Sequence, residues 1–454
     1  MDNTKNILAI IKRFAGDRKS FKRRMVFGGL SIAFMQGLTK ILALLLSMFL
    51  ARTLGKEGYG VYAYAFAITS FLLIFSQAGL PNLLVREVAA LEVSQKWDKL
   101  RGLITRAVQL NLVATATVLS IASAVLWYLK STLPPVSLKT FVFALALLPV
   151  FALTRTASAT LTGLQQVVKA MMMDSLMRPA LAFAFMVWLF MLYPSYRMPY
   201  NAMAAQLAGA LIVLVAIWTI LLRQLPPEVL HATPRYETKK WLASAFAFAL
   251  MDGAGLLNTQ ADILLLGMFR SPAEVGLYRV AAQGASLVAF GLMSANAIIA
   301  PQFARLYAKG DMEKLQRLVT ASARVILLVA LPVSLTLIFA GKKIILLLFG
   351  PQFIQSHAPL AILAVGQLIN AAMGSVGYLL NMTGHEKDVT RTLFATAGLN
   401  FLTNLILIPF YGINGAAFAT ALTTATWNYA LYRLVKKRIG IVSTALSWKG
   451  YGTK

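Results

Sequence analysis

The chain has 454 residues, of which 58 % are hydrophobic, and a mean hydropathy of +0.69. Its formal net charge is +27, from 43 Lys and Arg against 16 Asp and Glu, and it has no cysteine. This composition excludes a soluble globular protein, disulfide bonds and thiolate chemistry. A bilayer core about 30 Å thick needs about 20 helical residues per crossing, so the long apolar runs predict an all-α polytopic membrane protein.

The first expected element is a basic segment over residues 1–25, lying along the cytoplasmic membrane surface. It is not expected to be a signal peptide, because its apolar run is short and its charges follow that run. About twelve membrane-spanning helices should come next. They are expected near Phe27–Leu50, Gly60–Leu80, Ala107–Tyr128, Thr140–Leu161, Met171–Tyr193, Ala202–Leu222, Trp241–Phe269, Gly276–Ala300, Ala321–Ala340, Ala358–Met382, Thr390–Phe410 and Ile413–Leu434. The run Ile344–Phe349 is too short to cross and should extend the ninth helix or lie at the interface.

Most Lys and Arg residues precede the first span, fill the even-numbered gaps or follow the last span. Loops rich in Lys and Arg stay on the cytoplasmic side of a membrane. Both termini are therefore expected to be cytoplasmic, with the basic flanks against anionic lipid headgroups. This distribution accounts for the net charge without a nucleic-acid partner.

The polar gap Arg223–Lys240, which holds three prolines, divides the spans into two sets of six. Gly60-Val61-Tyr62 opens the second span and Gly276-Leu277-Tyr278 opens the eighth, and two further short similarities recur in the same order. This pattern predicts a duplicated six-helix unit. The expected organisation is an N-terminal lobe over 26–222, a cytoplasmic linker over 223–240, a C-terminal lobe over 241–435 and a basic tail over 436–454. Transporters with parallel repeats bind substrate between the halves.

A charge near the centre of a membrane costs about 2.5–3.5 kcal/mol, so charged residues within spans indicate a role. Asp252 and Asp262 both lie in the seventh span, ten residues apart, too distant along the helix to pair. Lys40 lies in the first span and Arg155 in the fourth. Two explanations stay open: these charges line a central cavity suited to an anionic headgroup, or they form ion pairs that hold helices together.

Arg178 follows Asp174 by one helical turn in the fifth span, a spacing that favours an ion pair. Uncharged polar side chains, among them Gln36 and Asn258, also gather in the spans. They suit either interhelical hydrogen bonds or a hydrated cavity.

The sequence has no phosphate-binding motif of the form G-x-x-x-x-G-K-[ST], and its three histidines have no metal-ligand spacing. No metal, cofactor or catalytic residue is therefore expected. A membrane-embedded glycan-assembly enzyme or a scaffold stays as an alternative to a transporter.

The segment from Leu50 to Tyr62, with the sequence LARTLGKEGYGVY, resembles the link between the first two helices of Wzx-type polysaccharide flippases. These belong to the multidrug/oligosaccharidyl-lipid/polysaccharide (MOP) exporter superfamily. Further similar stretches follow in the family's order over about residues 25–435: Ala78-Gly79-Leu80, Leu84-Val85-Arg86-Glu87, Ala261 to Gly267, Gly276-Leu277-Tyr278, Leu348-Phe349-Gly350 and Thr383-Gly384-His385.

This resemblance implies a MATE-like fold, with two six-helix lobes around a cavity that opens alternately to each side of a prokaryotic plasma membrane. It implies a flippase that moves an isoprenoid (polyprenyl) pyrophosphate-linked oligosaccharide to the outer leaflet, for O-antigen or exopolysaccharide synthesis. Polysaccharide polymerase and glycosyltransferase machinery are further candidate partners.

The residues expected to bind the pyrophosphate and sugars are Lys40, Arg52, Arg155, Gln36 and Asn258, and those expected in coupling or ion pairs are Asp252, Asp262, Asp174 and Arg178. An ion-coupled cation antiporter and a lipid II flippase are the alternatives within the superfamily. Lys40 and Arg155 disfavour the antiporter, and the small number of candidate cavity cations disfavours lipid II.

Overall fold

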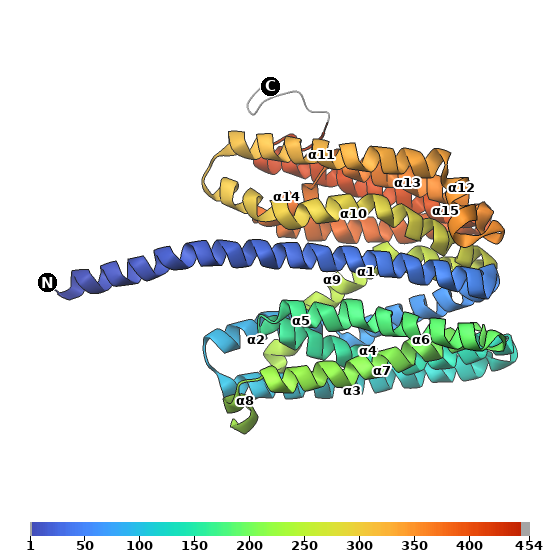
Figure 1. Ribbon diagram of the computed structural model, residues 1–454, viewed down its shortest axis with the longest axis horizontal. Helices are drawn as coiled ribbons and strands as arrows, with labels where there is room; N and C mark the ends of the chain where they lie inside the picture. The colour runs from blue at the N-terminus through green and yellow to red at the C-terminus, as the bar shows by residue number, and fades with distance from the viewer. Residues whose placement is uncertain (1, 446–454) are drawn as a thin grey trace.

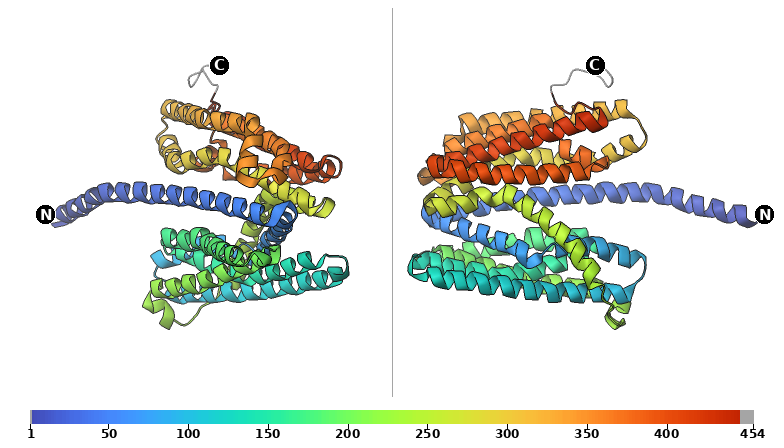
Figure 2. Two further views of the ribbon diagram at one scale, coloured as in Figure 1. Left: turned by 45° about the vertical axis from the view of Figure 1, so that its right-hand side comes forward. Right: turned by 180° about the vertical axis from the view of Figure 1, so that it is seen from behind.

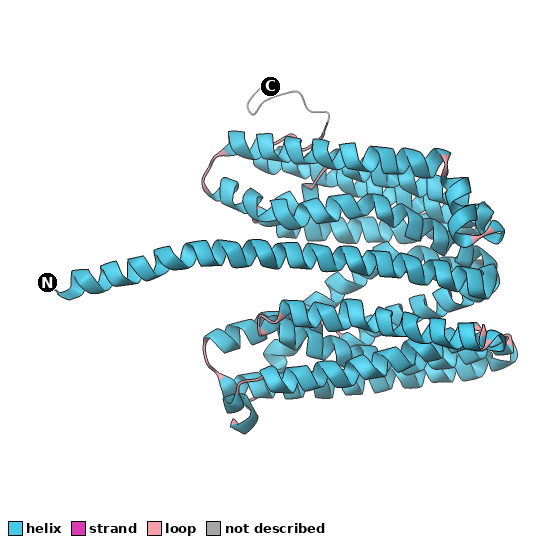
Figure 3. Cartoon of the chain, viewed as in Figure 1, coloured by secondary structure: helices cyan, strands magenta, loops and turns pink. Residues whose placement is uncertain are grey.

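The computed structural model describes residues 2–445, and side chains from residue 34 onward except those of 290, 291, 293, 294, 297 and 298. The side chains of the predicted basic segment 1–25, and residues 446–454 of the predicted tail, lie outside the described residues. Figure 3 shows that the described chain folds into helices and loops, without a strand. This result confirms the predicted all-α fold.

The first helix, α1 (Asp2–Gln77), contains two crossings that form a hairpin. Gly55 interrupts the helix with φ 69° and ψ 179°, a combination that glycine adopts without the strain imposed by a side chain. The two arms lie side by side, because Ser47 on the first arm and Tyr59 on the second share a 2.7 Å hydrogen bond between their hydroxyls. Helix α15 (Glu386–Ile439) reverses in the same way at Gly412.

The remaining helices form two groups that lie on either side of the first arm of α1 (Figure 1). One group contains α2 (Leu80–Val93), α3 (Trp97–Tyr128), α4 (Pro135–Gly163), α5 (Val167–Met171), α6 (Arg178–Leu192), α7 (Pro199–Gln224) and α8 (Pro227–His231). The other contains α10 (Pro272–Ala308), α11 (Met312–Phe339), α12 (Gly341–Phe349), α13 (His357–Met373), α14 (Val376–Met382) and α15. Helix α9 (Thr238–Phe269) runs obliquely between the groups (Figure 2).

Nine helical stretches of the described chain are long and apolar enough to cross a membrane. Two of them, Phe34–Gln77 and Glu386–Ile439, bend back at Gly55 and Gly412, and each of their arms has at least about 20 residues. With these arms counted separately and the 37-residue α10 added, the described chain has the expected twelve crossings. The expected short run 344–349 forms part of a separate helix, α12.

The tenth span is shorter than predicted. Its crossing helix α13 ends at Met373, and Gly374, with φ 71° and ψ −156°, separates it from α14. The residues on both sides of Gly374 are mostly apolar, and for that reason hydropathy did not reveal the break.

The apolar cores show how the two groups meet. At the end of the molecule that contains Gly55, here called the Gly55 end, one cluster joins both groups through residues such as Leu50, Tyr59, Tyr278 and Phe353. Toward the N-terminal end the core divides, with Leu100 in a cluster of the first group and Phe303 in a cluster of the second. The groups are therefore packed together at the Gly55 end and packed separately at the other.

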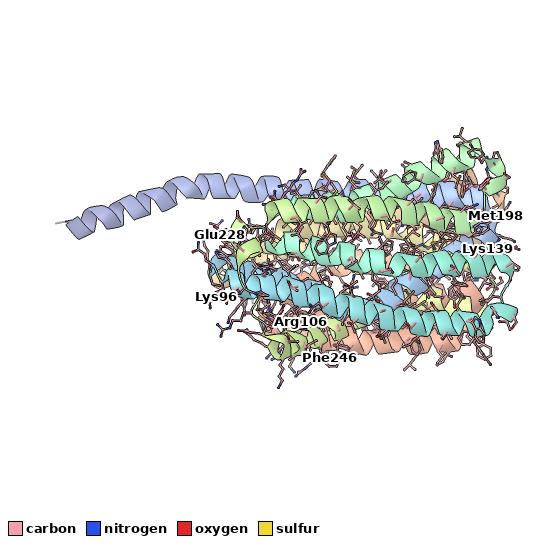
Figure 4. The ribbon with its side chains drawn as sticks, turned by 90° about the horizontal axis from the view of Figure 1, so that it is seen from below. Lys96, Arg106, Lys139, Met198, Glu228 and Phe246 are labelled. Atoms are coloured by element: carbon pink, nitrogen blue, oxygen red, sulfur yellow. The ribbon has the colours of Figure 1, made fainter. Side chains whose placement is uncertain are left out.

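The loops alternate between these ends as the predicted topology requires. Lys96 and Glu228 lie at the N-terminal end of the molecule, while Lys139 and Met198 lie at the Gly55 end (Figure 4). Polar contacts hold the segment between α8 and α9 against α3: Arg101 donates to the carbonyl oxygen of Ala232 at 2.7 Å, and Lys99 pairs with Glu237. We retain the predicted division into lobes at 26–222 and 241–435 as a proposal.

Candidate functional site

Two adjacent cavities share the side chains of Phe66, Arg178 and Gln260; one lies between the first group, α1 and α9, and the other is also lined by α10 of the second group. The larger one, here called the wide chamber, has a volume of about 540 Å³. Its polar lining consists of Ser70, Gln77, Asn82, Arg155, Asp174, Arg178, Asp252, Thr259 and Gln260. The smaller one, here called the apex chamber, has a volume of about 320 Å³. Its polar lining consists of Thr39, Ser47, Tyr59, Tyr62, Ser175, Arg178, Gln206, Gln260, Arg279 and Gln283.

The α1 residues that line each chamber show where the chambers lie along the molecule. The second arm of α1 begins after Gly55, and it contributes residues 59–67 to the apex chamber but residues 66–77 to the wide chamber. The apex chamber is therefore nearer the Gly55 end. A third cavity, of about 580 Å³, lies along α1, α3 and α4 and has no charged side chain in its lining. It does not suit a charged headgroup.

One carboxylate in the wide chamber is shared by two arginines. Asp174 Oδ2 lies 3.2 Å from Nη1 of Arg155, and Asp174 Oδ1 lies 3.4 Å from Nε of Arg178. The side chain of Asp174 is only 7 % exposed, whereas that of Arg155 is 57 % exposed. The guanidinium of Arg178 also stacks over the ring of Phe151, with its central carbon 4.4 Å from the ring centroid. One carboxylate and one aromatic ring thus hold two cations beside the cavity.

A π-helical turn over Met172–Met177 positions this cluster. Pro179 has no N–H to donate to the carbonyl oxygen of Ser175, four residues earlier, so that oxygen is free for another donor. Thr39 on α1 supplies a donor, with its hydroxyl 3.4 Å from the Ser175 oxygen. Single π-helical turns are often found at functional sites, and this one carries Asp174 and precedes Arg178.

The two acidic residues of α9 have separate surroundings, as their spacing predicted. Both carboxylate oxygens of Asp252 accept from Nδ2 of Asn82, at 2.9 and 3.0 Å. Asp262 is buried, and its carboxylate accepts from the hydroxyl of Tyr278 and from the backbone N–H of Ile263. Asp252 therefore faces the wide chamber, while Asp262 belongs to the packing between α9 and α10.

Arg279 on α10 enters the apex chamber and was missed as a site residue by the sequence analysis. Tyr59, which shares a hydrogen bond with Ser47, lines the same chamber, so polar groups from α10 and from both arms of α1 come together here. Among the described side chains, Arg279 has no salt bridge within 4 Å. The sequence placed Arg279 at the start of a span, but α10 begins at Pro272 and carries Arg279 two turns into the helix.

The other predicted binding residues are spread more widely. Lys40 is half-buried and close enough to Arg279 for the two charges to repel, but it lines neither chamber. Arg52 also lies outside both chambers, because its guanidinium donates to the carbonyl oxygens of Leu347 and Leu348 at the end of α12.

Asn258 faces α15 rather than the chambers. Its Nδ2 lies 3.4 Å from the carbonyl oxygen of Leu393. Gln36 is on the first arm of α1 and lines neither chamber. Of the predicted site residues, the structure thus brings together Arg155, Asp174, Arg178 and Asp252.

Comparison with known proteins agrees with this architecture. The most similar solved structures include an inward-facing multidrug resistance MATE family transporter of the MOP superfamily, with a TM-score of 0.71 and 14 % identity over 88 % of this chain and 94 % of that one. They also include the lipid II flippase MurJ in an inward closed conformation, with a TM-score of 0.68 and 14 % identity over 89 % of this chain and 87 % of that one. These likenesses show the fold.

Among curated proteins, the probable low-salt glycan biosynthesis flippase Agl15 of Haloferax volcanii is 23 % identical over 193 residues. The match covers 42 % of this chain and 41 % of that protein, so the chain spans less than half of the length of this relative. The named relatives are transporters and flippases, in agreement with the expectation that the chain is not an enzyme. Residues 26–307 match the family described as "Polysaccharide biosynthesis protein". The chain therefore belongs to this polysaccharide biosynthesis family and has the fold of the MOP superfamily, which confirms the resemblance found in the sequence.

Proposed function

We propose that the protein is a flippase for an isoprenoid pyrophosphate-linked oligosaccharide, which it moves from the cytoplasmic to the outer leaflet of a prokaryotic plasma membrane by alternating access. In this orientation both termini are cytoplasmic. The glycan then serves cell-surface polysaccharide synthesis, with polymerase and glycosyltransferase machinery as candidate partners. The named flippase relative supports this assignment, although it matches only part of the chain.

The observation that carries the proposal is the sharing of Asp174 by Arg155 and Arg178. One carboxylate cannot neutralise two guanidinium groups, so the Asp174 cluster keeps a net positive charge, which Asp252 balances within the described lining of the wide chamber. Arg279 adds a further cation in the apex chamber. Guanidinium groups bind phosphate oxygens in a bidentate manner and stay charged, which suits a pyrophosphate.

The same charges disfavour an antiporter for organic cations. Such a protein needs a cavity with an anionic excess, whereas the described lining of the two chambers has three arginines against Asp174 and Asp252. We assign pyrophosphate binding to Arg155 and Arg178. Asp252 is the candidate for a coupling proton, because its carboxylate faces the chamber and bonds to neutral Asn82.

The test is transbilayer movement in proteoliposomes that contain the purified full chain. One arm follows an isoprenoid pyrophosphate-linked oligosaccharide with an impermeant lectin, and a parallel arm follows a cationic dye. We expect lectin-accessible lipid to equilibrate between leaflets while the dye stays where it was loaded. Dye movement driven by an imposed proton or sodium gradient, without lipid movement, would instead identify an antiporter.

A further inference from the structure

We infer that residues 441–445, which follow α15 and are here called the strap, form a conformational switch for the tenth span. When the strap is docked, this span is broken at Gly374 into α13 and α14. When the strap is released, α13 and α14 join into one continuous helix. The inference goes beyond the proposed function and does not depend on the substrate that the protein carries.

The strap is bound to α11 and α14 by specific contacts. The side-chain amide of Gln316, a buried residue of α11, satisfies both backbone polar groups of Val442. Its Nε2 atom donates to the Val442 carbonyl oxygen at 2.7 Å, and its Oε1 atom accepts from the Val442 N–H at 2.9 Å. Ile441 is fully buried in the apolar cluster that also contains Leu379 of α14. The strap is therefore a packed part of the second group, next to the break that it controls.

The strap also supplies a hydrogen bond that a continuous helix would otherwise make. The backbone N–H of Ala445 donates to the carbonyl oxygen of Ala372, in the last turn of α13, at 3.0 Å. In an unbroken α-helix this oxygen would accept from the N–H of Val376, four residues later. Here the Val376 N–H instead bonds to the carbonyl oxygen of Gly374 at 3.0 Å. The strap thus competes with helix continuation for the Ala372 carbonyl group, which is the physical basis of the switch.

The break has little support from its own residues. Ser375 occupies the N-cap position of α14 but makes no capping hydrogen bond, and its buried hydroxyl has no partner within the described part of the protein. Residues 360–382 contain no proline, so the chain can form one helix through this region. The α14 helix also begins with backbone N–H groups that lack an intrahelical acceptor, and continuation from α13 would provide those acceptors. The docked strap, rather than a local cap, therefore stabilises the break.

Gly374 joins the conformation of the span to the position of the strap. Its φ of 71° and ψ of −156° lie in a region that is almost restricted to glycine. A Cβ atom on this residue would lie 3.1 Å from the carbonyl oxygen of Ser443 in the strap and 2.9 Å from Cβ of Ala323 on α11. Alanine is strained in this conformation but favours a helix interior over glycine. Gly374→Ala should therefore shift the equilibrium toward the continuous helix and the released strap.

The experiment uses Ser443→Cys as a single reporter in the purified, cysteine-free full chain in detergent. The Ser443 side chain is fully buried and its hydroxyl has no described partner, so this exchange removes no described hydrogen bond. The rate of maleimide labelling is compared between the reporter alone and the reporter with Gly374→Ala. Gly377→Ala is the matched control, because a Cβ atom there lies in ordinary contact, 3.5 Å from Leu431. Backbone hydrogen exchange is measured on the same variants without the reporter.

We expect Gly374→Ala to speed labelling of the strap by about ten-fold and Gly377→Ala to leave it unchanged. In Gly374→Ala, hydrogen exchange should become faster in residues 441–445 but slower at the start of α14, where backbone N–H groups gain helical partners. Equal labelling of the two variants would overturn the coupling between strap and break. Faster exchange in both segments would also overturn the switch, because the break would then loosen without forming a continuous helix.

A second pair of variants covers a Gly374→Ala protein that does not fold. Gln316→Leu removes both hydrogen bonds to Val442, and Thr320→Val is its control, because it removes only the 2.8 Å bond between Thr320 and the same side-chain amide. We expect Gln316→Leu to give the faster strap labelling and the slower exchange at the start of α14, and Thr320→Val to give neither. Equal behaviour of these two variants would overturn the inference. None of these outcomes bears on the flippase proposal.

Discussion

Gly60 and Gly276 meet where the two helix groups pack against each other at the Gly55 end. A Cβ atom at Gly60 would lie 1.7 Å from the carbonyl oxygen of Pro272 and 3.0 Å from the backbone nitrogen of Gly276. These glycines occupy equivalent places in the two halves of the sequence, before Val61-Tyr62 and Leu277-Tyr278. Equivalent residues of two repeats can touch only near the pseudo-twofold axis that relates the repeats. The contact between Gly60 and Gly276 is therefore expected if that axis passes between these two glycines.

Because no side chain fits at this contact, we expect Gly60→Ala to separate the groups at the Gly55 end. The cysteine-free chain allows a single reporter, Ser47→Cys, which is buried beside Tyr59 in the wild type. In the Gly60→Ala background, an impermeant maleimide should label this cysteine faster. Gly398→Ala is the control, because a Cβ atom there meets no neighbour within 4 Å. Equal labelling rates in the two backgrounds would show that the glycine contact does not close this end.

The role of Arg178 depends on the geometry of its guanidinium as well as its charge. Arg178→Lys keeps the charge but loses the planar group that bonds to Asp174 and stacks over Phe151. We expect about a ten-fold slower lipid movement in proteoliposomes, equivalent to about 1.4 kcal/mol. Arg223→Lys, at an exposed site on α7, should move the lipid at the wild-type rate. Wild-type movement by a well-folded Arg178→Lys protein would remove Arg178 from the binding site.

The proposed membrane orientation can be tested with two exposed lysines that lie at opposite ends of the molecule, Lys96 and Lys139 (Figure 4). In intact cells, a membrane-impermeant maleimide should label the Lys139→Cys variant directly. The Lys96→Cys variant should react only after the membrane is permeabilised. The reverse pattern would invert the topology and, with it, the proposed direction of transport.

The segment before α9 contains a group whose ionisation should affect stability. A hydrogen bond from Lys99 lowers the pKa of Glu237 below its usual range. A lowered carboxyl pKa contributes stability above the pKa of the unfolded chain, about 4.3, and that contribution is lost as the pH falls through the folded value. Glu237→Gln should therefore lower the thermal unfolding temperature slightly at neutral pH and have no effect in strong acid. A pH-independent difference between the two proteins would mean that the ion pair is not its cause.

The crossings could be predicted from sequence because each apolar run must form a helix in lipid, whatever its neighbours are. The Asp174–Arg178 pair could also be predicted, since its partners are one turn apart on the same helix. The pairing of Asp174 with Arg155 could not, because these residues lie on different helices and a π-helical turn sets their approach. Arg52 was expected at the pyrophosphate, but nothing in the sequence showed that the carbonyl end of α12 would be close to it.

The same reasoning explains why the apex chamber was not found. Gln206, Gln260 and Arg279 come from three different helices that are far apart in the sequence. Hydropathy reports how polar a span is but not which spans meet. The equivalent contact of Gly60 and Gly276, by contrast, follows from the repeat that the sequence already indicated.

The most direct test of the central claim is whether the lipid headgroup occupies the wide chamber. Ser70 lines this chamber, so a Ser70→Cys variant of the cysteine-free chain reports access to it. We expect an isoprenoid pyrophosphate-linked oligosaccharide to slow maleimide labelling of this cysteine, and we expect the protection to be lost when Arg178→Ala is added. A cationic dye should give no protection. Protection by the dye and none by the lipid would contradict the account.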